Sequence, residues 1–339
     1  MKRMLLLFLI GLLIYNCETN PSKSKDQLKG DCFILCEGNF TSSEASLWLY
    51  DGKETHGPVY WDLTANPLGS VGQSMTIDND NLYILVNASN EIKVLGVDTQ
   101  DDHGTISLPA ASPRYLVVWH NYGYVSCWGA MGIIKFNLNN YSIEDTIAIG
   151  ALPEYMVLDG DMLYVSITMN AMWGSDNRVI GYDLSETNPV GVDTFEVISN
   201  PGMMLLDGNE LWVSSTYYDD AWQTYAGMSK IDLNTKSVIK KEYGLTSNFS
   251  TDLLKIDSDI YTTYNDGIVK LDADLNMITS DKIGYLSKKV YCVVEKDEMI
   301  YFGTTDYVAP DTVYVLNKEG EIKDEMKVGA LPGDIIFVK

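Results

Sequence analysis

Several aromatic side chains of this 339-residue chain lie in short polar segments between its apolar runs. Three of the seven Trp residues, Trp128, Trp173 and Trp222, are of this kind. The same segments, and the Pro-containing segments that precede apolar runs, hold Phe40, Arg114, Tyr155, Met203, Tyr217, Tyr218 and Tyr307. Trp, Tyr and Met side chains offer broad apolar contact with some hydrogen-bonding capacity, which suits a large amphiphilic ligand. We predict that these ten residues bind a ligand.

Residues for acid–base or metal chemistry are scarce in these segments. None of the three His residues falls there, and a lyase or lactonase would need a His base or a metal held by carboxylates. Acidic residues in these segments could supply oxygen ligands for Ca²⁺, but their spacing specifies no site. These acidic residues are Glu37, Glu154, Asp219, Asp220, Asp252 and Asp306. We predict no catalytic residue, no metal, no cofactor and no enzymatic activity.

The charge of the chain excludes one class of partner. Asp and Glu number 47 against 24 Lys and Arg, which gives a formal net charge of −23. Nucleic-acid binding requires a basic surface that meets phosphates, and the sequence supplies none.

A repeated unit positions the aromatic segments. An aromatic residue within a short apolar run recurs every 40 to 50 residues, at Phe33, Tyr83, Tyr124, Tyr164, Trp212, Tyr261 and Tyr301. A second apolar run follows each copy and usually closes on Asp or Asn, which begins a turn. A third run precedes most copies and often begins at Pro, as at Pro113, Pro153, Pro201 and Pro332.

Seven such units without helical periodicity predict an all-β fold, a seven-bladed β-propeller. Residues 332–339 resemble the first strand of a unit whose other strands begin at Cys32. We therefore expect the C-terminal strand to pair with the N-terminal blade and to close the ring, which removes open sheet edges.

The order of strands in a propeller blade brings the aromatic segments to one face. Loops that enter the inner strand and loops that follow the aromatic strand share that face, whereas plain turns such as Asp159-Gly160-Asp161 lie on the other. We interpret the insertions at 168–177 and 215–226 as long irregular loops, which commonly carry function. For any single aromatic residue, packing between blades is the alternative.

The N-terminus predicts export and lipid attachment. A basic start and an apolar run predict a signal peptide over residues 1–16, and the arrangement around Cys17 resembles a bacterial lipoprotein signal. Residues 17–29 would then form a flexible tether with lipidated Cys17, and residues 30–339 the propeller. Membrane attachment would be by lipid only. The remaining cysteines, Cys32, Cys36, Cys127 and Cys292, are expected as buried thiols.

The segment Phe33-Ile34-Leu35-Cys36-Glu37-Gly38-Asn39-Phe40, followed by Ser46-Leu47 and Tyr50-Asp51, resembles the opening of the YncE-like propeller lipoproteins of Bacteroidetes. Those proteins usually have Asn where this chain has Cys36. Residues 152–166 are similar to the same family, and the resemblance covers 30–339. It implies an outer-membrane or cell-surface lipoprotein. Its BtuG-type members capture vitamin B12 and pass it to an outer-membrane transporter.

Three functional hypotheses follow. The first is a lipoprotein that captures a small-molecule ligand, a corrinoid foremost, for transfer to a transporter partner. The second is a non-catalytic scaffold that binds an envelope protein or a glycan. The third is a propeller lyase or hydrolase.

Overall fold

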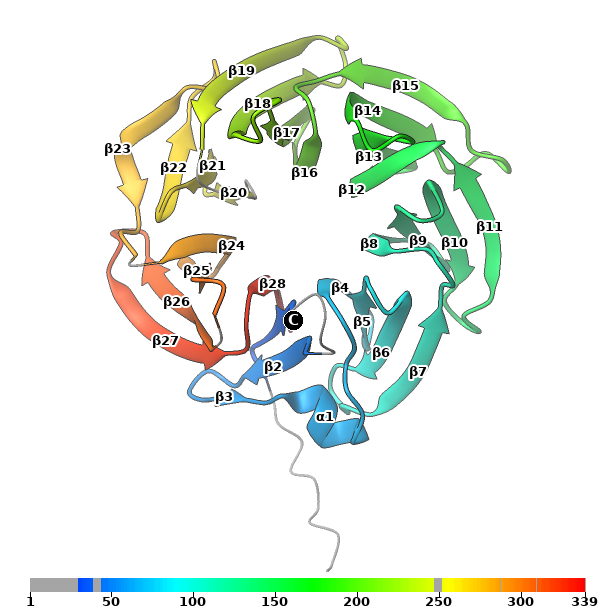
Figure 1. Ribbon diagram of the computed structural model, residues 1–339, viewed down its shortest axis with the longest axis vertical. Helices are drawn as coiled ribbons and strands as arrows, with labels where there is room; N and C mark the ends of the chain where they lie inside the picture. Colours follow the sequence, from blue (N-terminus) through cyan, green and yellow to red (C-terminus); the bar gives the residue numbers. More distant parts are fainter. Residues whose placement is uncertain (1–29, 39–43, 247–251, 287, 309, 339) are drawn as a thin grey trace, which may run out of the picture.

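The computed structural model describes residues 30–338 apart from 39–43, 247–251, 287 and 309. The predicted signal peptide, lipidated Cys17 and tether, and the predicted ligand-binding residue Phe40, lie outside the described residues. Seven four-stranded antiparallel sheets stand in a ring (Figure 1). In a β-propeller such a ring surrounds a central channel. The prediction of a seven-bladed β-propeller is therefore confirmed.

Each blade is numbered here by its position in the ring, and its strands are given from the channel outwards. Blade 1 consists of β28 (Pro332–Phe337), β1 (Cys32–Cys36), β2 (Ser46–Tyr50) and β3 (Thr55–His56). Blade 2 consists of β4 (Gly72–Asp78), β5 (Asn81–Val86), β6 (Glu91–Gly96) and β7 (Asp102–Ser107). Blade 3 consists of β8 (Pro113–Trp119), β9 (Tyr122–Cys127), β10 (Gly132–Asn137) and β11 (Ile143–Ala148).

The remaining blades follow in the same order. Blade 4 consists of β12 (Ala151–Asp159), β13 (Met162–Asn170), β14 (Ser175–Asp183) and β15 (Gly191–Glu196). Blade 5 consists of β16 (Pro201–Asp207), β17 (Glu210–Tyr218), β18 (Thr224–Asp232) and β19 (Val238–Leu245). Blade 6 consists of β20 (Leu253–Ile256), β21 (Asp259–Tyr264), β22 (Gly267–Leu271) and β23 (Met277–Ile283). Blade 7 consists of β24 (Lys289–Lys296), β25 (Met299–Thr305), β26 (Asp311–Asn317) and β27 (Ile322–Val328).

Blade 1 joins the two ends of the described chain. β28 pairs antiparallel with β1, with Ile336 opposite Phe33 and Ile335 opposite Ile34. The predicted closure by the C-terminal strand is thus confirmed. One element was not predicted: α1 (Val59–Thr64), a short helix on the outer edge of blade 1 that buries Val59 and Tyr60 (Figure 1).

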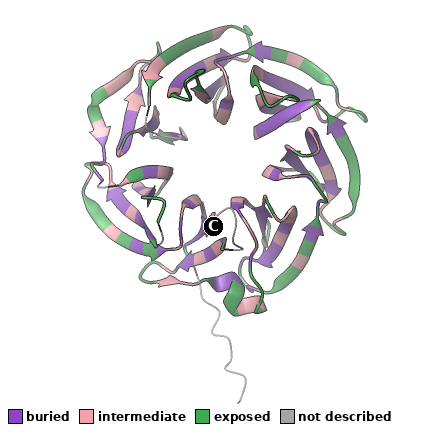
Figure 2. Cartoon of the chain, viewed as in Figure 1, coloured by how far each residue is buried: buried purple, intermediate pink, exposed green. Residues whose placement is uncertain are grey.

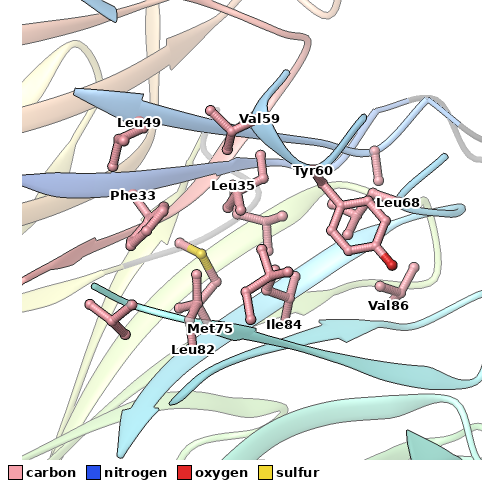
Figure 3. Close-up of a cluster of buried hydrophobic side chains, with 14 residues drawn as sticks. Phe33, Leu35, Leu49, Val59, Tyr60, Leu68, Met75, Leu82, Ile84 and Val86 are labelled. Atoms are coloured by element: carbon pink, nitrogen blue, oxygen red, sulfur yellow. The ribbon is translucent and has the colours of Figure 1, made fainter. Parts of the chain in front are cut away.

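The repeated aromatic residue packs each blade against the next. Buried residues are densest on the second and third strands of each blade, and the outermost strands are largely exposed (Figure 2). Between blades 1 and 2, Phe33 packs with Met75 and Leu82 (Figure 3). Between blades 2 and 3, the Tyr83 ring lies 6.4 Å from that of Phe136. The recurring aromatic position therefore fills the wedge between neighbouring blades, which holds the ring closed.

Two details of the chain complete the fold. Cys32, Cys36, Cys127 and Cys292 are buried and unpaired, as expected, and burial raises the pKa of the Cys32 and Cys127 thiols to about 12. Among the described residues, no helix has the length and apolar character needed to cross a membrane.

Candidate ligand-binding site

A cavity of about 900 Å³ opens where the inner strands begin, and residues of all seven blades line it. The inner strands of six blades contribute Gly333, Gln73, Arg114, Glu154, Gly202 and Tyr291, and Asp252 immediately precedes the inner strand of blade 6. The hairpins of blades 3, 4 and 5 add the aromatic residues Trp128, Trp173, Tyr218 and Trp222. The cavity therefore combines a polar floor with an aromatic wall on one side.

β-Bulges create the polar floor. In six of the seven inner strands the register with the second strand shifts near the start of the strand. The bulge follows the first pairing position in four of these strands, the second in β24 and the third in β12. Pro113 pairs with Cys127 and Leu116 with Val125, so Arg114 and its neighbour bulge out of the sheet. A bulge re-aims side chains. Every blade with this bulge places at least one bulged residue on the cavity surface.

Small hydroxyl side chains of the second strands hold these bulges. Ser126 Oγ accepts a hydrogen bond from the Tyr115 N–H (3.1 Å) and donates one to the Glu154 carbonyl of the next blade (2.6 Å). Ser166 Oγ makes the same pair of bonds to Tyr155 and Gly202, at 3.0 and 2.8 Å. These serines end the repeated aromatic–Val–Ser run. The repeat thus fixes the cavity floor from blade to blade.

Arg114 is the centre of the floor. Its Nε and Nη2 donate to the two carboxylate oxygens of Glu154, at 3.0 and 2.6 Å, and Nη1 donates to Gln73 Oε1. The guanidinium also stacks 4.2 Å above the ring of Trp128. Burial alone would lower the pKa of Arg114, but the Glu154 carboxylate raises it above its ordinary value. This bidentate arrangement holds the side chain rigidly.

Trp173 and Trp222 occupy equivalent positions at two hairpin tips. Asn170 Oδ1 and Asp219 Oδ1 accept hydrogen bonds from the backbone N–H groups two and four residues further on, at 2.9–3.1 Å and 2.9 Å. The next-to-last residue of each turn is the Trp, with φ of 62° and 60°. The left-handed region favours Gly and Asn, and a bulky residue there is strained.

Both tryptophans remain open to solvent despite that strain. Trp173 is 63% exposed and Trp222 is 82% exposed. Trp173 stands edge-on to Trp128 with ring centroids 5.9 Å apart, and Trp222 lies 6.2 Å from Tyr218. Backbone strain that brings an exposed aromatic ring to a cavity is typical of a functional position.

The cavity lining is acidic. It contains the carboxyl groups of Glu37, Glu154, Asp219, Asp220 and Asp252, against Arg114 as the one cation among its described residues. Burial raises the pKa of the Glu37 carboxyl, while a hydrogen bond from Tyr291 and the charge of Arg114 lower it. Because Glu154 already neutralises Arg114, an anionic ligand would meet net repulsion. Nowhere in the described part of the chain do three His, Cys, Asp or Glu residues group as a metal site.

The structure brings most of the predicted ligand-binding residues together. Arg114, Trp128, Trp173, Met203, Tyr218 and Trp222 all line the cavity. Three others do not. Tyr155 packs on Tyr115 (ring centroids 4.6 Å apart), Tyr217 stacks on Tyr225 across the hairpin (5.6 Å), and Tyr307 lies against Tyr291 (6.5 Å). Tyr307 still touches the site indirectly, because Tyr291 is a lining residue.

The insertions that carry two of the tryptophans differ from expectation. Residues 168–177 and 215–226 were expected as irregular loops. Instead they extend the hairpins β13–β14 and β17–β18, whose strands have nine residues each and close in short turns. A regular hairpin holds its tip more firmly than a free loop would, because backbone hydrogen bonds continue to the turn.

Sequence reasoning missed Gln73, Asn200 and Tyr291 as lining residues. Gln73 and Tyr291 occupy the bulge positions that Arg114 and Glu154 occupy in their blades. Their strands begin without the Pro that marked the other segments, so only the register of the sheets shows that these positions are equivalent. Asn200 precedes Pro201, and no repeated pattern marked it.

The chain is thus a seven-bladed β-propeller with a cavity at the aromatic mouth of its channel. No protein-family model matches it, and no curated protein matches it. Solved propellers do match. Hydrazine synthase of Kuenenia stuttgartiensis is 14% identical, with a TM-score of 0.62 over 78% of this chain and 88% of that one.

Two further solved structures show the same likeness. A candidate 6-phosphogluconolactonase from Bacteroides fragilis is 12% identical, with a TM-score of 0.64 over 94% of this chain and 100% of that one. BamB from Moraxella catarrhalis is 14% identical, with a TM-score of 0.55 over 90% of this chain and 85% of that one. At such identities the likeness shows the fold alone, so function must be argued from the site.

Proposed function

We propose that this protein is a binding protein that captures a corrinoid in the aromatic mouth of its propeller. One observation carries the proposal: six residues chosen from sequence as ligand-binding, from blades 3, 4 and 5, line a single cavity of about 900 Å³. This volume lies in the range of organic-ligand sites, which are concave, largely apolar and provided with a few polar groups.

The chemistry of the lining supports a ligand of this class. Trp173, Trp222 and Tyr218 offer exposed ring faces and edges to a flat macrocycle. The floor offers N–H donors at Arg114 and at the Gln73 amide, whose oxygen already accepts from Arg114, and such donors suit the carbonyl oxygens of neutral amide groups at the periphery of a corrin ring. The excess of carboxyl groups disfavours sugar phosphates and other strongly anionic ligands.

The hydrogen bonding of the carboxylates supports binding rather than catalysis. Glu154 is held by Arg114, and Asp219 caps its own turn and accepts a hydrogen bond from Tyr225. Asp252 Oδ2 accepts a hydrogen bond from the Val293 N–H at 2.8 Å. Carboxylates engaged in this way build the cavity and are poorly placed to transfer protons to a substrate.

A place in the cell envelope belongs to the same proposal. Lipidation of Cys17 would anchor the protein to the outer membrane or cell surface, where it would pass its ligand to a transporter. Mass spectrometry of the mature N-terminus tests this part: a lipid-modified Cys17 is expected, and an unmodified N-terminus at another residue would contradict it.

The binding proposal is tested by calorimetric titration of residues 18–339 with cyanocobalamin and cobinamide. One-to-one binding with dissociation constants below micromolar is expected. Absence of heat and of co-elution at tens of micromolar protein would overturn the corrinoid assignment. Trp61→Gln serves as a control, because this exposed Trp lies on α1 at the outer edge of the ring.

One observation favours a second candidate, a propeller hydrolase or lyase. Glu37 lines the cavity with a pKa raised by burial, and it accepts a hydrogen bond from Tyr291. A carboxylic acid of this kind can act as a general acid or base. Turnover of a lactone or uronate substrate that Glu37→Gln abolishes would support this candidate. Absence of turnover would contradict it, and turnover unaffected by that change would exclude Glu37 as the acid or base.

A further inference from the structure

Two lining residues of the cavity carry buried polar atoms that have no hydrogen-bond partner among the described residues. These atoms are Trp128 Nε1, a donor, and Asn200 Oδ1, an acceptor. Buried polar atoms are nearly always hydrogen-bonded in native proteins, so each exception requires an explanation. Here one donor and one acceptor belong to the same cavity, which a single ligand could satisfy.

The remaining contacts of Trp128 fix its ring. Arg114 covers one face at 4.2 Å, and Trp173 stands edge-on with an interplanar angle of 87°. These contacts orient the indole without providing an acceptor for its N–H. Trp173 is 63% exposed, so it is the neighbour that can turn aside when a ligand approaches the N–H.

The contacts of Asn200 define which of its atoms is free. Asn200 Nδ2 donates to the Thr168 carbonyl at 2.9 Å, and the Asn200 N–H donates to the Asp176 carbonyl at 2.8 Å. The bond to Thr168 assigns the side-chain nitrogen and leaves Oδ1 as the unpaired atom. Asn200 Oδ1 is thus an acceptor, and the hydrogen bonds of the Asn200 side-chain nitrogen and backbone N–H hold it in place.

A group that satisfies both atoms must accept from an indole N–H and donate to an amide oxygen. A neutral carboxamide does both through two separate atoms, and a hydroxyl does both through one oxygen; of the two, the carboxamide is the group that the proposed corrinoid carries around its ring. A carboxylate lacks the donor and is repelled by the acidic lining, and an ammonium lacks the acceptor. We propose that Trp128 and Asn200 recognise neutral carboxamide groups of the ligand. This inference rests on the proposed function in that it concerns the same cavity, and it specifies the ligand groups recognised there.

The chain provides a matched control for Trp128. Trp212 also has a buried indole N–H without a described partner, but it lies in the core between blades 5 and 6 and does not line the cavity. Trp128→Phe and Trp212→Phe each remove one unpaired N–H and keep an aromatic ring. Only the former should change ligand binding.

The test uses small pyridine probes whose binding is followed by the indole N–H signals in NMR spectra of residues 18–339. Nicotinamide should shift the Trp128 signal and leave that of Trp212 unchanged. 3-Acetylpyridine lacks the donor and should bind about tenfold more weakly, and nicotinate, which is anionic, weaker still. Trp128→Phe should weaken nicotinamide and cyanocobalamin about tenfold, whereas Trp212→Phe should weaken neither.

The outcomes separate this inference from the proposed function. If nicotinamide fails to shift the Trp128 signal, or if Trp128→Phe binds both probes as the native protein does, the inference is wrong even when cyanocobalamin binds. If nicotinamide behaves as expected but cyanocobalamin does not bind, the carboxamide site stands and the corrinoid assignment is wrong.

Discussion

Replacement of Trp222 by Asn should weaken ligand binding strongly while leaving the propeller as stable as the native protein. Trp222 has φ of 60°, a conformation that Asn adopts with less strain than Trp. Its side chain is 82% exposed, so little packing is lost with it. The position therefore separates a role in binding from a role in folding.

The two contributions to stability are of similar size and opposite sign. Less than a fifth of the Trp222 surface is covered, roughly 45 Å², and its loss destabilises by about 1 kcal/mol. Relief of the left-handed strain stabilises by about 1 kcal/mol. The melting temperature should therefore change by less than about 3 °C. If the ligand covers about 100 Å² of the indole, loss of that contact costs about 2.5 kcal/mol, or roughly 60-fold in Kd.

Calorimetric titration with cyanocobalamin and differential scanning calorimetry of the same samples measure both effects. Trp173→Asn, at the equivalent position of the neighbouring hairpin, should weaken binding alike, but it should lower the melting temperature further, because Trp173 is only 63% exposed and packs on Trp128. Trp61→Gln should change neither quantity. A fall in melting temperature of about 8 °C or more would show that Trp222 packs between blades, and an unchanged Kd would show that it does not touch the ligand.

Two further changes test the floor of the cavity, and a third tests Asp334, which follows the lining residue Gly333. Ser126→Ala leaves the Tyr115 N–H and the Glu154 carbonyl without their buried partner and should lower the unfolding free energy by about 2 kcal/mol in chemical denaturation. Arg114→Met leaves the Glu154 carboxylate unpaired and should lower the unfolding free energy by about 3–5 kcal/mol. The double variant Arg114→Met/Glu154→Leu should recover most of this loss, and an equal loss in the single and double variants would contradict the prediction. Burial raises the pKa of Asp334 to about 6, so the folded state holds a proton that the unfolded state releases near pH 4. Stability should therefore fall as pH rises from about 4 to about 6, and this fall should be smaller in Asp334→Asn, with identical pH profiles as the refuting result.

The fold could be predicted because its repeat is a direct consequence of packing. In each blade, an aromatic ring on the second strand from the centre fills the wedge between that blade and the next. Tyr83, Tyr124 and Trp212 therefore recur at nearly constant spacing. α1 could not be predicted in this way. It is a six-residue helix inside one blade connection, too short to show a periodic pattern.

The cavity lining includes the predicted residues where loop position alone determines where a residue lies. Trp128, Trp173 and Trp222 lie in connections between second and third strands, which meet at one face in any propeller. Strand geometry instead decides which predicted residues of the hairpins line the cavity. Tyr217 and Tyr218 are adjacent on β17, and alternation along a strand allows only one of them to face the cavity.

The bulges of the inner strands could not be read from residue types. Gln73 and Tyr291 occupy the same register position as Arg114. However, the Pro that marks four of the inner strands in the sequence is absent from β4 and β24, the strands of Gln73 and Tyr291. Register depends on pairing with the second strand, which a single sequence does not reveal when the turn lengths differ. The serine that ends the aromatic run indicates this position after the fact, because Ser126 and Ser166 hold the bulges.

The most direct test of the account is a crystal structure of residues 18–339 with cyanocobalamin. The account predicts one corrinoid per chain in the cavity, with its ring against Trp173 and Trp222 and its carboxamides near Trp128 and Asn200. A corrinoid on the opposite face, among turns such as Asp159-Gly160-Asp161, or no bound corrinoid at saturating concentration, would contradict it.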